Sequence, residues 1–587
     1  MANSVSGRAF DVSLFKRVMR YVRPYNKLFY LTGALTILLA ILTPLRPYLI
    51  QYTVDNAIVK PNGQLLITLT IVMVSILIVE GGVQFIQTYM ANKVGQSVIK
   101  DLRNETYDKI VNFKLKYFDR TPIGRLVTRA VSDIETISEI FSQGILIIVG
   151  DILKLVVVIG FMFYIDWRLT LFSLVPIPVL IIATNIFKNY IKAAFQDVRN
   201  AVSNLNSFVQ EHITGMNIVQ IFNQEKREHK RFSDINKEHM KAHIRTVWAN
   251  SIFFPIVEVL SATSIALLVW WGSKSVIQGE ASLGNLVAFI LYIYMLFRPI
   301  RQLADRFNVL QMGMVASERV FKVLDTDATI EDSGDKIPSY LNGKIEFDHV
   351  WFAYEGEDWI LKDLTFDVNK GETAAFVGET GAGKTSVINL LSRFYEFQKG
   401  SITIDKEDIR TYDLAKLRER VGVVLQDVFL FSDSIYNNIT LYNENISKNK
   451  VIEASKLVGA HEFIMKLPGN YDFNVRERGG MLSVGQRQLI AFIRAYVYDP
   501  SILVLDEATS SVDTESEMMI QRAIEVLTKG RTSIVIAHRL ATIQNADKII
   551  VLDKGRVMEI GNHQELLKKD GHYKTLYELQ FSESEQE

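Results

Sequence analysis

The chain has 587 residues, of which 48% are hydrophobic and 22% are charged, and its formal net charge is zero. This length exceeds that of one ordinary core and predicts two large domains. The lack of a basic surplus argues against a nucleic-acid partner. Cysteine is absent from the sequence, which excludes disulfides, thiolate catalysis and cysteine-based metal sites and fits a reducing cytoplasm.

Long apolar segments dominate the first half of the chain. A helix needs about 20 largely apolar residues to cross the hydrocarbon core of a bilayer. A single run could be a buried core helix, but six in series predict a membrane α-helical bundle. The first is the weakest, because Pro44, Arg46 and Pro47 interrupt it. The six segments are residues 28–50, 65–91, 140–165, 169–187, 252–272 and 283–300.

Lysine and arginine alternate between the two sides of these spans. The segment before the first span is basic, nine cations lie between Lys93 and Arg129, and ten lie between Lys188 and Arg245. The other three loops carry only Lys60, Arg168 and Lys274 as clearly positive residues. Because cytoplasmic loops hold the cations, we expect a multi-pass protein of the cytoplasmic (inner) membrane with both termini in the cytoplasm.

The two internal connections are too long to be structureless, at about 50 and 65 residues. Their helix-forming composition predicts spanning helices that continue far into the cytoplasm, as two hairpins. The sequence places the turns of these hairpins at residues 118–125 and 213–216, where we expect contact with whatever lies below the membrane.

Four charged residues fall inside the spans, where each costs about 2.5–3.5 kcal/mol on insertion and is by default a functional candidate. Asp151 and Lys154 lie three residues apart on one helix face, so a structural ion pair is favoured. Glu80 and Glu258 have no evident local partner. They could be structural, or could face a central cavity and favour cationic substrates.

The second half begins with strand-like segments at residues 344–347, 366–368 and 373–377. The last leads into a G-x-x-x-x-G-K-T motif that opens a helix at Ser386, which predicts an α/β P-loop NTPase domain that binds ATP. Its glycines let backbone N–H groups surround phosphate oxygens, and the helix N-terminus favours anions. Lys384 would reach the β- and γ-phosphates and the Thr385 hydroxyl would bind Mg²⁺. The motif consists of Gly378, Glu379, Thr380, Gly381, Ala382, Gly383, Lys384 and Thr385.

A second motif has four consecutive apolar residues, 502–505, followed by Asp506 and Glu507. The apolar run predicts a parallel strand covered on both faces. Asp506 would hold Mg²⁺ through its water shell, and Glu507 would be the general base for the attacking water. Acidic residues at the corner after a strand often have only a structural role. That explanation is improbable for this pair, because it lies downstream of a P-loop.

Further motifs occur in a fixed order. The run before the acidic strand resembles the signature motif of ATP-binding cassette (ABC) proteins; it consists of Leu482, Ser483, Val484, Gly485 and Gln486. The resemblance implies roles for further residues: an adenine-stacking aromatic, a glutamine that touches Mg²⁺ and water, an acid that meets the hairpins, a D-loop, and a histidine at the γ-phosphate. In that order they are Tyr354, Gln426, Glu477, the run Ser510, Ser511, Val512 and Asp513, and His538.

This resemblance covers nearly the whole chain, including the Trp-Arg-Leu-Thr run at 167–170 after the third span. It implies a half-transporter of the multidrug or lipid exporter type: an ATPase that exports a hydrophobic or amphipathic drug, lipid or peptide. It further implies the following extents: an amphipathic elbow at 1–27, the transmembrane domain at 28–325, a linker at 326–340, the nucleotide domain at 341–580 and a polar tail at 581–587. An ATP-gated channel or regulatory protein on the same scaffold is the alternative.

In this family the signature motif of one chain completes the ATP site of another, which implies a dimer in the bilayer. Val484 departs from the usual L-S-G-G-Q, and a β-branched residue resists positive φ, so this motif is expected to engage phosphate less well. Paired half-transporters often combine one chain with a catalytic glutamate and an altered signature with a second, complementary chain. Glu507 with Val484 fits the first pattern and favours a heterodimer. A homodimer that tolerates Val484 is the alternative.

Overall fold

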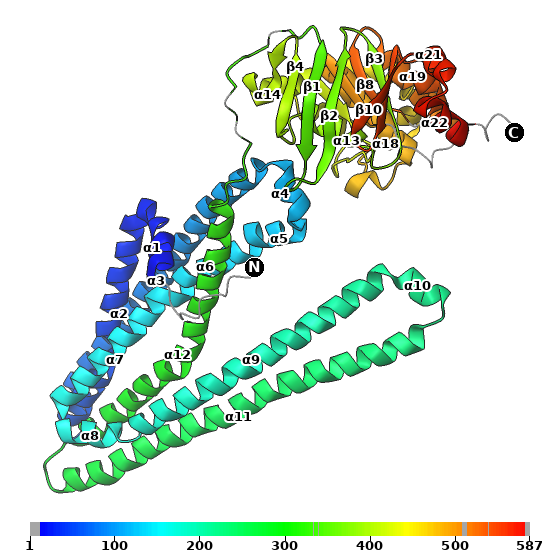
Figure 1. The fold of residues 1–587 in the computed structure, drawn as a ribbon. Helices are drawn as coiled ribbons and strands as arrows, with labels where there is room; N and C mark the ends of the chain where they lie inside the picture. The colour runs from blue at the N-terminus through cyan, green and yellow to red at the C-terminus, as the bar shows by residue number, and fades with distance from the viewer. Residues whose placement is uncertain are drawn as a thin grey trace. The chain divides into compact units, whose positions relative to one another are not determined.

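The computed structural model describes residues 12–330, 332, 334–338, 340–506, 514–537 and 539–581. The chain divides into two compact units. A helical unit comprises Met1–Val111 and Pro122–Asp327, and an α/β unit comprises Asn112–Thr121 and Ala328–Glu587 (Figure 1).

Long helices build the helical unit. Of the described residues, five helical stretches are long and apolar enough to cross a membrane, and α12 adds a shorter apolar stretch, Leu283–Pro299. The helices are α1 (Val12–Arg20), α2 (Asn26–Thr53), α3 (Gly63–Val111), α5 (Ile123–Thr128), α6 (Ile134–Glu139), α7 (Leu146–Ile165), α8 (Trp167–Leu174), α9 (Ile177–Thr214), α10 (Met216–Ile221), α11 (Glu225–Ile277) and α12 (Leu283–Leu324).

The predicted helical continuation of the spans is confirmed. Helices α3, α9 and α11 have 49, 38 and 53 residues, well beyond what a bilayer requires. Helices α9 and α11 pack against each other and are joined through the short helix α10 (Figure 1).

The end of the helical unit away from α10 consists of the short connections after residues 58, 165 and 277. We call it the turn end. Asp166 caps α8 by accepting hydrogen bonds from the backbone N–H groups of Arg168 and Leu169. Two polar contacts tie the connections together: Arg168 pairs with Glu280 at 2.9 Å, and the Ser282 hydroxyl donates to Asp55 at 2.6 Å. The three connections therefore lie at one level.

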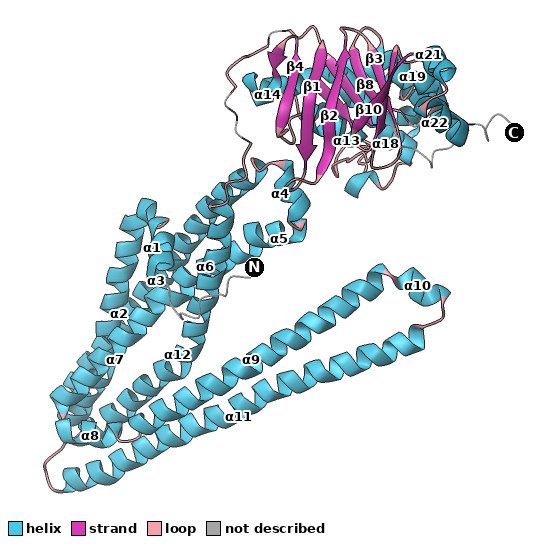
Figure 2. Cartoon of the chain, in the orientation of Figure 1, coloured by secondary structure: helices cyan, strands magenta, loops and turns pink. Residues whose placement is uncertain are grey.

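Two sheets form the α/β unit (Figure 2). An antiparallel sheet has the order β2-β1-β4-β5: β1 (Ile345–Ala353), β2 (Trp359–Val368), β4 (Lys399–Ile404) and β5 (Glu407–Asp408). A six-stranded sheet has the order β10-β9-β3-β8-β7-β6 and is parallel except for the last strand, β10. It consists of β3 (Thr373–Val377), β6 (Val421–Val424), β7 (Ile502–Asp506), β8 (Thr532–Ile536), β9 (Lys548–Asp553) and β10 (Arg556–Gly561).

Apolar side chains pack on both faces of the six-stranded sheet. Residues 502–505 of β7 are all buried, which confirms the prediction of a strand covered on both sides. One face carries a core that includes α16, α18 and α19, and the other packs against β1, β4 and α13. The helices of this unit are α4 (Leu115–Arg120), α13 (Lys384–Leu391), α14 (Leu414–Arg420), α15 (Ile435–Thr440), α16 (Lys448–Val458), α17 (His461–Lys466), α18 (Val484–Tyr498), α19 (Thr514–Thr528), α20 (Leu540–Gln544), α21 (His563–Lys569) and α22 (His572–Phe581).

Helix α4 is part of the α/β unit, although it lies far from the rest of it in sequence. Its Asp119 carboxylate accepts a hydrogen bond from the Tyr395 hydroxyl, and Arg120 pairs with Glu355 at 2.5 Å. Backbone bonding adds to this, because the Lys114 N–H donates to the Ala328 carbonyl at 2.7 Å. The predicted turn of the first hairpin thus contacts the α/β unit.

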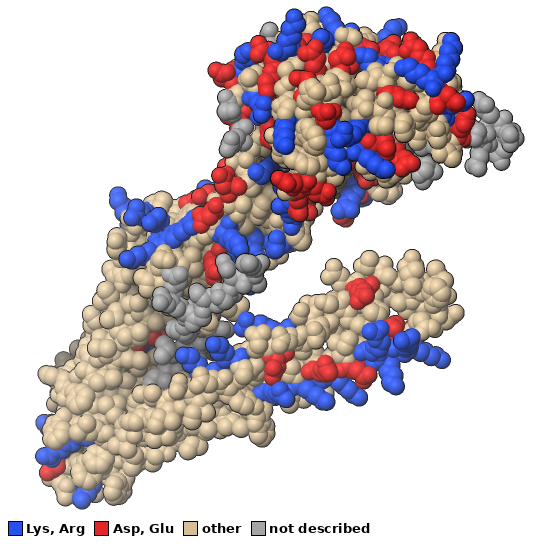
Figure 3. All heavy atoms as spheres, viewed as in Figure 1, with Lys and Arg blue, Asp and Glu red and all other residues tan. Residues whose placement is uncertain are grey.

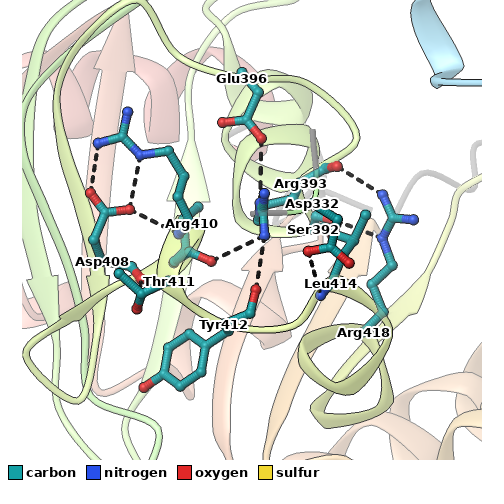
Figure 4. A network of polar contacts seen from close by, with 11 residues as sticks. Asp332, Ser392, Arg393, Glu396, Asp408, Arg410, Thr411, Tyr412, Leu414 and Arg418 are labelled. Atoms are coloured by element: carbon teal, nitrogen blue, oxygen red, sulfur yellow. Dashed lines mark hydrogen bonds and ion pairs between the residues drawn. The ribbon is translucent and has the colours of Figure 1, made fainter. Parts of the chain in front are cut away.

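A buried arginine joins the end of α13 to the segment before α14 (Figure 4). The Arg393 side chain is 1% exposed. Its guanidinium donates to the carbonyls of Ile409 and Tyr412 at 3.4 and 3.2 Å and pairs with Glu396 at 3.3 Å. A buried cation is tolerated only with such partners, so Arg393 fixes this corner of the unit.

Candidate functional site

The loop between β3 and α13 requires its glycines. Gly378, Gly381 and Gly383 have φ values of +149°, +88° and +103°. A Cβ at Gly378 would lie 2.1 Å from the Leu552 carbonyl oxygen. Only glycine satisfies both the conformation and the space, so backbone N–H groups can line the loop without obstruction.

Lys384 lies beneath this loop. Its ammonium donates to the carbonyls of Gly378 and Glu379 at 2.5 and 3.0 Å, which holds it under the phosphate-binding backbone. Burial lowers the pKa of Lys384, and the nearby Asp506 carboxylate opposes that shift. Burial likewise raises the pKa of Asp506, opposed by Lys384. The end of β7 and the start of α13 therefore form one electrostatic pair at the carboxyl edge of the sheet.

Oxygen ligands suited to Mg²⁺ gather at the same edge. Thr385 is exposed in the first turn of α13, Asp506 ends β7, and Gln426 is exposed just after β6. Hydroxyl, carboxylate and amide oxygens are the ligands that this hard cation prefers. Asp427 also acts on the Asp506 carboxylate and raises its pKa, an acid that the motif analysis did not single out.

Tyr354 is anchored to α13 through its hydroxyl. The hydroxyl lies 3.1 Å from Ser386 Oγ and accepts a hydrogen bond from Asn389 at 3.1 Å. The ring meets the Tyr395 ring edge-on, with centroids 4.9 Å apart. The phosphate-loop helix therefore sets the position of the aromatic ring expected to stack on adenine. Asn389 and Tyr395 were not predicted, since neither belongs to a motif.

Removing this hydroxyl provides a first test. Tyr354→Phe keeps the ring and loses both hydrogen bonds, so we expect the KM for ATP to rise about fivefold with little change in kcat. Steady-state ATPase titrations measure the effect. Tyr442→Phe, which removes an exposed hydroxyl bonded to Asp433, serves as the matched control. An unchanged KM in Tyr354→Phe would show that the anchor is not needed.

The signature run begins α18. Ser483 caps the helix: its hydroxyl accepts from the Gln486 N–H at 3.2 Å, and Gln486 accepts in return from the Ser483 N–H at 3.1 Å. Val484 is the first residue of α18 and is not among the residues with positive φ. Positive φ therefore does not strain Val484 here, and the weaker engagement of phosphate by this motif stays a prediction. Its side chain is 42% exposed beside the helix N-terminus, while Gly485 and Leu482 are buried.

Several predicted residues lie outside the part of the chain that the structure describes: Glu507, Ser510, Ser511, Val512, Asp513 and His538. Of the others, Glu379 and Thr380 are exposed at the top of the phosphate loop and Ala382 and Ser386 are buried within it. Glu477 is exposed five residues before Leu482.

The acids predicted inside the spans have different surroundings. Glu80, which has no evident local partner in the sequence, pairs with Arg46 at 3.3 Å and accepts from the Thr43 hydroxyl at 2.8 Å. Both partners lie on the neighbouring helix α2, which the spacing within one helix cannot reveal. Glu258 is exposed on α11 beside Phe254, at a shallow hollow.

Fold and site together define a membrane-spanning P-loop ATPase. Residues 29–300 match the family described as ABC transporter transmembrane region, and residues 361–510 match the family described as ABC transporter. The chain is 38% identical over 584 residues to the "Uncharacterized ABC transporter ATP-binding protein YknV" of Bacillus subtilis (strain 168), covering 99% of this chain and 97% of the relative.

Two further relatives carry functional names. The chain is 34% identical to the "ATP-dependent lipid A-core flippase" of Syntrophus aciditrophicus (strain SB), over 97% of this chain and 95% of the relative. It is 37% identical to the "Probable multidrug resistance ABC transporter ATP-binding/permease protein YheH" of Bacillus subtilis (strain 168), over 85% of this chain and 74% of the relative. This chain belongs to the ABC transporter family. It is an ATPase-coupled, multi-pass membrane exporter that binds ATP.

Proposed function

We propose that this chain works as one half of a dimeric exporter and moves a hydrophobic or amphipathic drug, lipid or peptide out of the cytoplasm. Both termini and the α/β unit would lie in the cytoplasm. The observation that carries the proposal is the chemistry at the edge of the six-stranded sheet, where Lys384 and Asp506 face each other beneath a glycine-lined loop.

The residues take the following roles. Lys384 and the N–H groups of Gly378, Gly381 and Gly383 bind the phosphates, and Tyr354 stacks on adenine. Thr385, Gln426 and, through water, Asp506 would hold Mg²⁺, which when bound neutralises phosphate charge. Glu507 accepts the proton of the attacking water, and His538 contacts the γ-phosphate. Ser510, Ser511, Val512 and Asp513 form the D-loop.

A second half-transporter completes the site. The N-terminus of α18 is an anion-binding position, with the Ser483 hydroxyl and the N–H groups of Val484 and Gly485 available to a phosphate. In the proposed dimer this helix end faces ATP held by the partner. ATP then favours the closed dimer because it binds that state better than the open one.

We favour a heterodimer. Val484 adds an exposed branched side chain at the helix end that would approach the partner's ATP, so this chain offers its partner a less accommodating surface. Glu507 is present in the same chain, which suits a pair in which one ATP site is fast and the other slow.

Co-purification tests this arrangement. A single affinity-tagged copy of the chain, expressed from its native genome, should retain a different half-transporter at a one-to-one ratio. A dimer that contains this chain alone, without a second half-transporter, would contradict the heterodimer and leave the export proposal intact. A monomer with full ATPase activity would contradict both.

The signature residues provide a paired prediction. Ser483→Ala removes the cap of α18, about 1 kcal/mol, together with a phosphate ligand, so ATPase activity of the dimer should fall about tenfold. Val484→Gly should raise the activity of the site that this helix completes. Measurement of the ATPase rate in the assembled dimer tests both. Equal rates in wild type and Val484→Gly would show that the valine does not impede phosphate.

A further inference from the structure

Charged side chains form a layer inside the helical unit, on α2 and on the three helices that contact it. Arg46 lies on α2, Glu80 on α3, Asp151 and Lys154 on α7, and Arg298 on α12. Arg46 and Glu80 are paired. Lys154 interacts electrostatically with all four of the others, so the five residues form one cluster, which we call the charged layer.

Helix geometry places this layer deep in the membrane-spanning region. The turn end lies at one level, and each residue adds a rise of about 1.5 Å. Counted from residues 58, 63, 165 and 283, where the helical turns meet the connections, the five residues are 11 to 17 positions from the turn end. They therefore lie about 16–25 Å from that end, a distance within the length of a hydrocarbon core of about 30 Å.

The exposed members of the charged layer suit water rather than lipid. Arg46 and Arg298 are exposed, and an arginine exposed to hydrocarbon would cost several kcal/mol. On α3, Ile71, Ile78 and Phe85 form an exposed apolar stripe, and Glu80 lies about 200° around the helix from Ile78. That stripe suits lipid, and in the proposed dimer the opposite face would line the aqueous path of the substrate.

The space-filling view agrees with this division. Figure 3 shows Lys, Arg, Asp and Glu gathered at the turn end and along the far halves of α9 and α11. Between them, the face in view is almost continuously uncharged. On the face in view, the stretch of α9 and α11 between these groups is thus apolar, whereas the charged layer lies on α2, α3, α7 and α12.

Cations exceed carboxylates in the layer. Arg46 neutralises Glu80, which leaves Lys154 and Arg298 opposite Asp151 alone. Among the described residues, neither the Lys154 ammonium nor the Arg298 guanidinium donates a hydrogen bond or forms an ion pair at contact distance. Arg306, eight residues after Arg298 on α12, also interacts electrostatically with Asp151 and adds positive charge. Cationic groups held at this depth without direct partners suit an anionic ligand.

We propose that the exported substrate is an amphipath with an acidic headgroup, a phosphate, sulfate or carboxylate, which Lys154 and Arg298 bind within the charged layer. This deepens the proposed export function and rests on it. It also reverses the expectation, based on Glu80 as an unpaired acid, that the cavity favours cations. The substrate's apolar part would lie against the uncharged surfaces of the same helices.

The test uses the assembled transporter in phosphatidylcholine vesicles, with ATP-dependent translocation as the readout. Three tail-matched fluorescent lipids carry phosphatidylglycerol, phosphatidylcholine or trimethylammonium headgroups. Dodecyl phosphate and dodecyltrimethylammonium serve as dissolved probes. Transport of the two anionic probes should exceed that of the others. Preferred transport of the anionic lipid indicates that the substrate comes from the bilayer, and preferred transport of dodecyl phosphate indicates that it comes from solution. Either result supports the proposal.

Variants make the assignment specific. The double variant Lys154→Gln/Arg298→Gln should lower anion transport about tenfold and leave transport of the trimethylammonium probes unchanged or higher. Lys154→Arg/Arg298→Lys should restore most of the activity, since both charges return. Lys60→Gln, which removes an exposed cation near the turn end, should have no effect.

Two outcomes would overturn the proposal. Equal transport of all headgroups by wild type and by the double variant rejects the anionic substrate while leaving export of amphipaths intact. No ATP-dependent movement of any probe by wild type, with ATPase activity present, rejects export of amphipaths and the anion site with it.

Discussion

Steady-state ATP hydrolysis is expected to fall about 1,000-fold when Glu507 is replaced by Gln, while ATP binding persists. Glu507 directly follows Asp506, whose carboxylate ends β7 opposite Lys384. An amide keeps the size of the side chain and cannot accept a proton from the attacking water. ATP binding by equilibrium dialysis and phosphate release from the same preparation measure the two effects.

A matched change controls for the loss of a carboxylate. Glu517→Gln on α19 alters a carboxylate that pairs with Arg539 at 3.6 Å, outside the phosphate loop, and should leave hydrolysis close to wild type. Hydrolysis in Glu507→Gln within about tenfold of wild type would contradict its assignment as general base.

The largest loss of stability is expected from Arg393→Met. Methionine fills much of the same volume but leaves the Ile409 and Tyr412 carbonyls without their donor, at about 3 kcal/mol in total. For a unit of this size such a loss lowers the unfolding temperature by about 8 °C. Loss of ATPase activity on heating of the intact transporter measures the shift.

Arg410→Met is the control for this change. The Arg410 side chain is 46% exposed and pairs with Asp408, so its removal should cost at most about 1 kcal/mol. Equal thermal shifts in the two variants would show that the carbonyl partners of Arg393 do not determine its contribution.

Local patterns predicted much of the architecture. Apolar length indicated the spans, since the bilayer imposes one dimension on every crossing helix. The buried strand β7 was predictable because four consecutive apolar residues require cover on both faces. The phosphate loop was predictable because its glycines serve a backbone conformation that few other residues adopt, as Gly378 and Gly383 show.

Contacts between distant segments were not predictable in the same way. The Arg46 partner of Glu80 lies on another helix, and the Asn389 partner of Tyr354 depends on how α13 packs against β1. The motif alone also does not say that Val484 already has helical φ in α18. In each case three-dimensional packing, rather than sequence spacing, determines the neighbour.

The place of α4 has a practical consequence. A fragment cut at the linker would lack residues 112–121 and therefore one element of its own fold. Tyr395 would lose the Asp119 acceptor, and the Tyr354 ring beside it would lose part of its support. Nucleotide affinities measured on such a fragment would thus describe an incomplete protein. Three covalent crossings, near residues 111, 122 and 327, attach the α/β unit to the rest of the chain, so a cut at the linker alone would not release it.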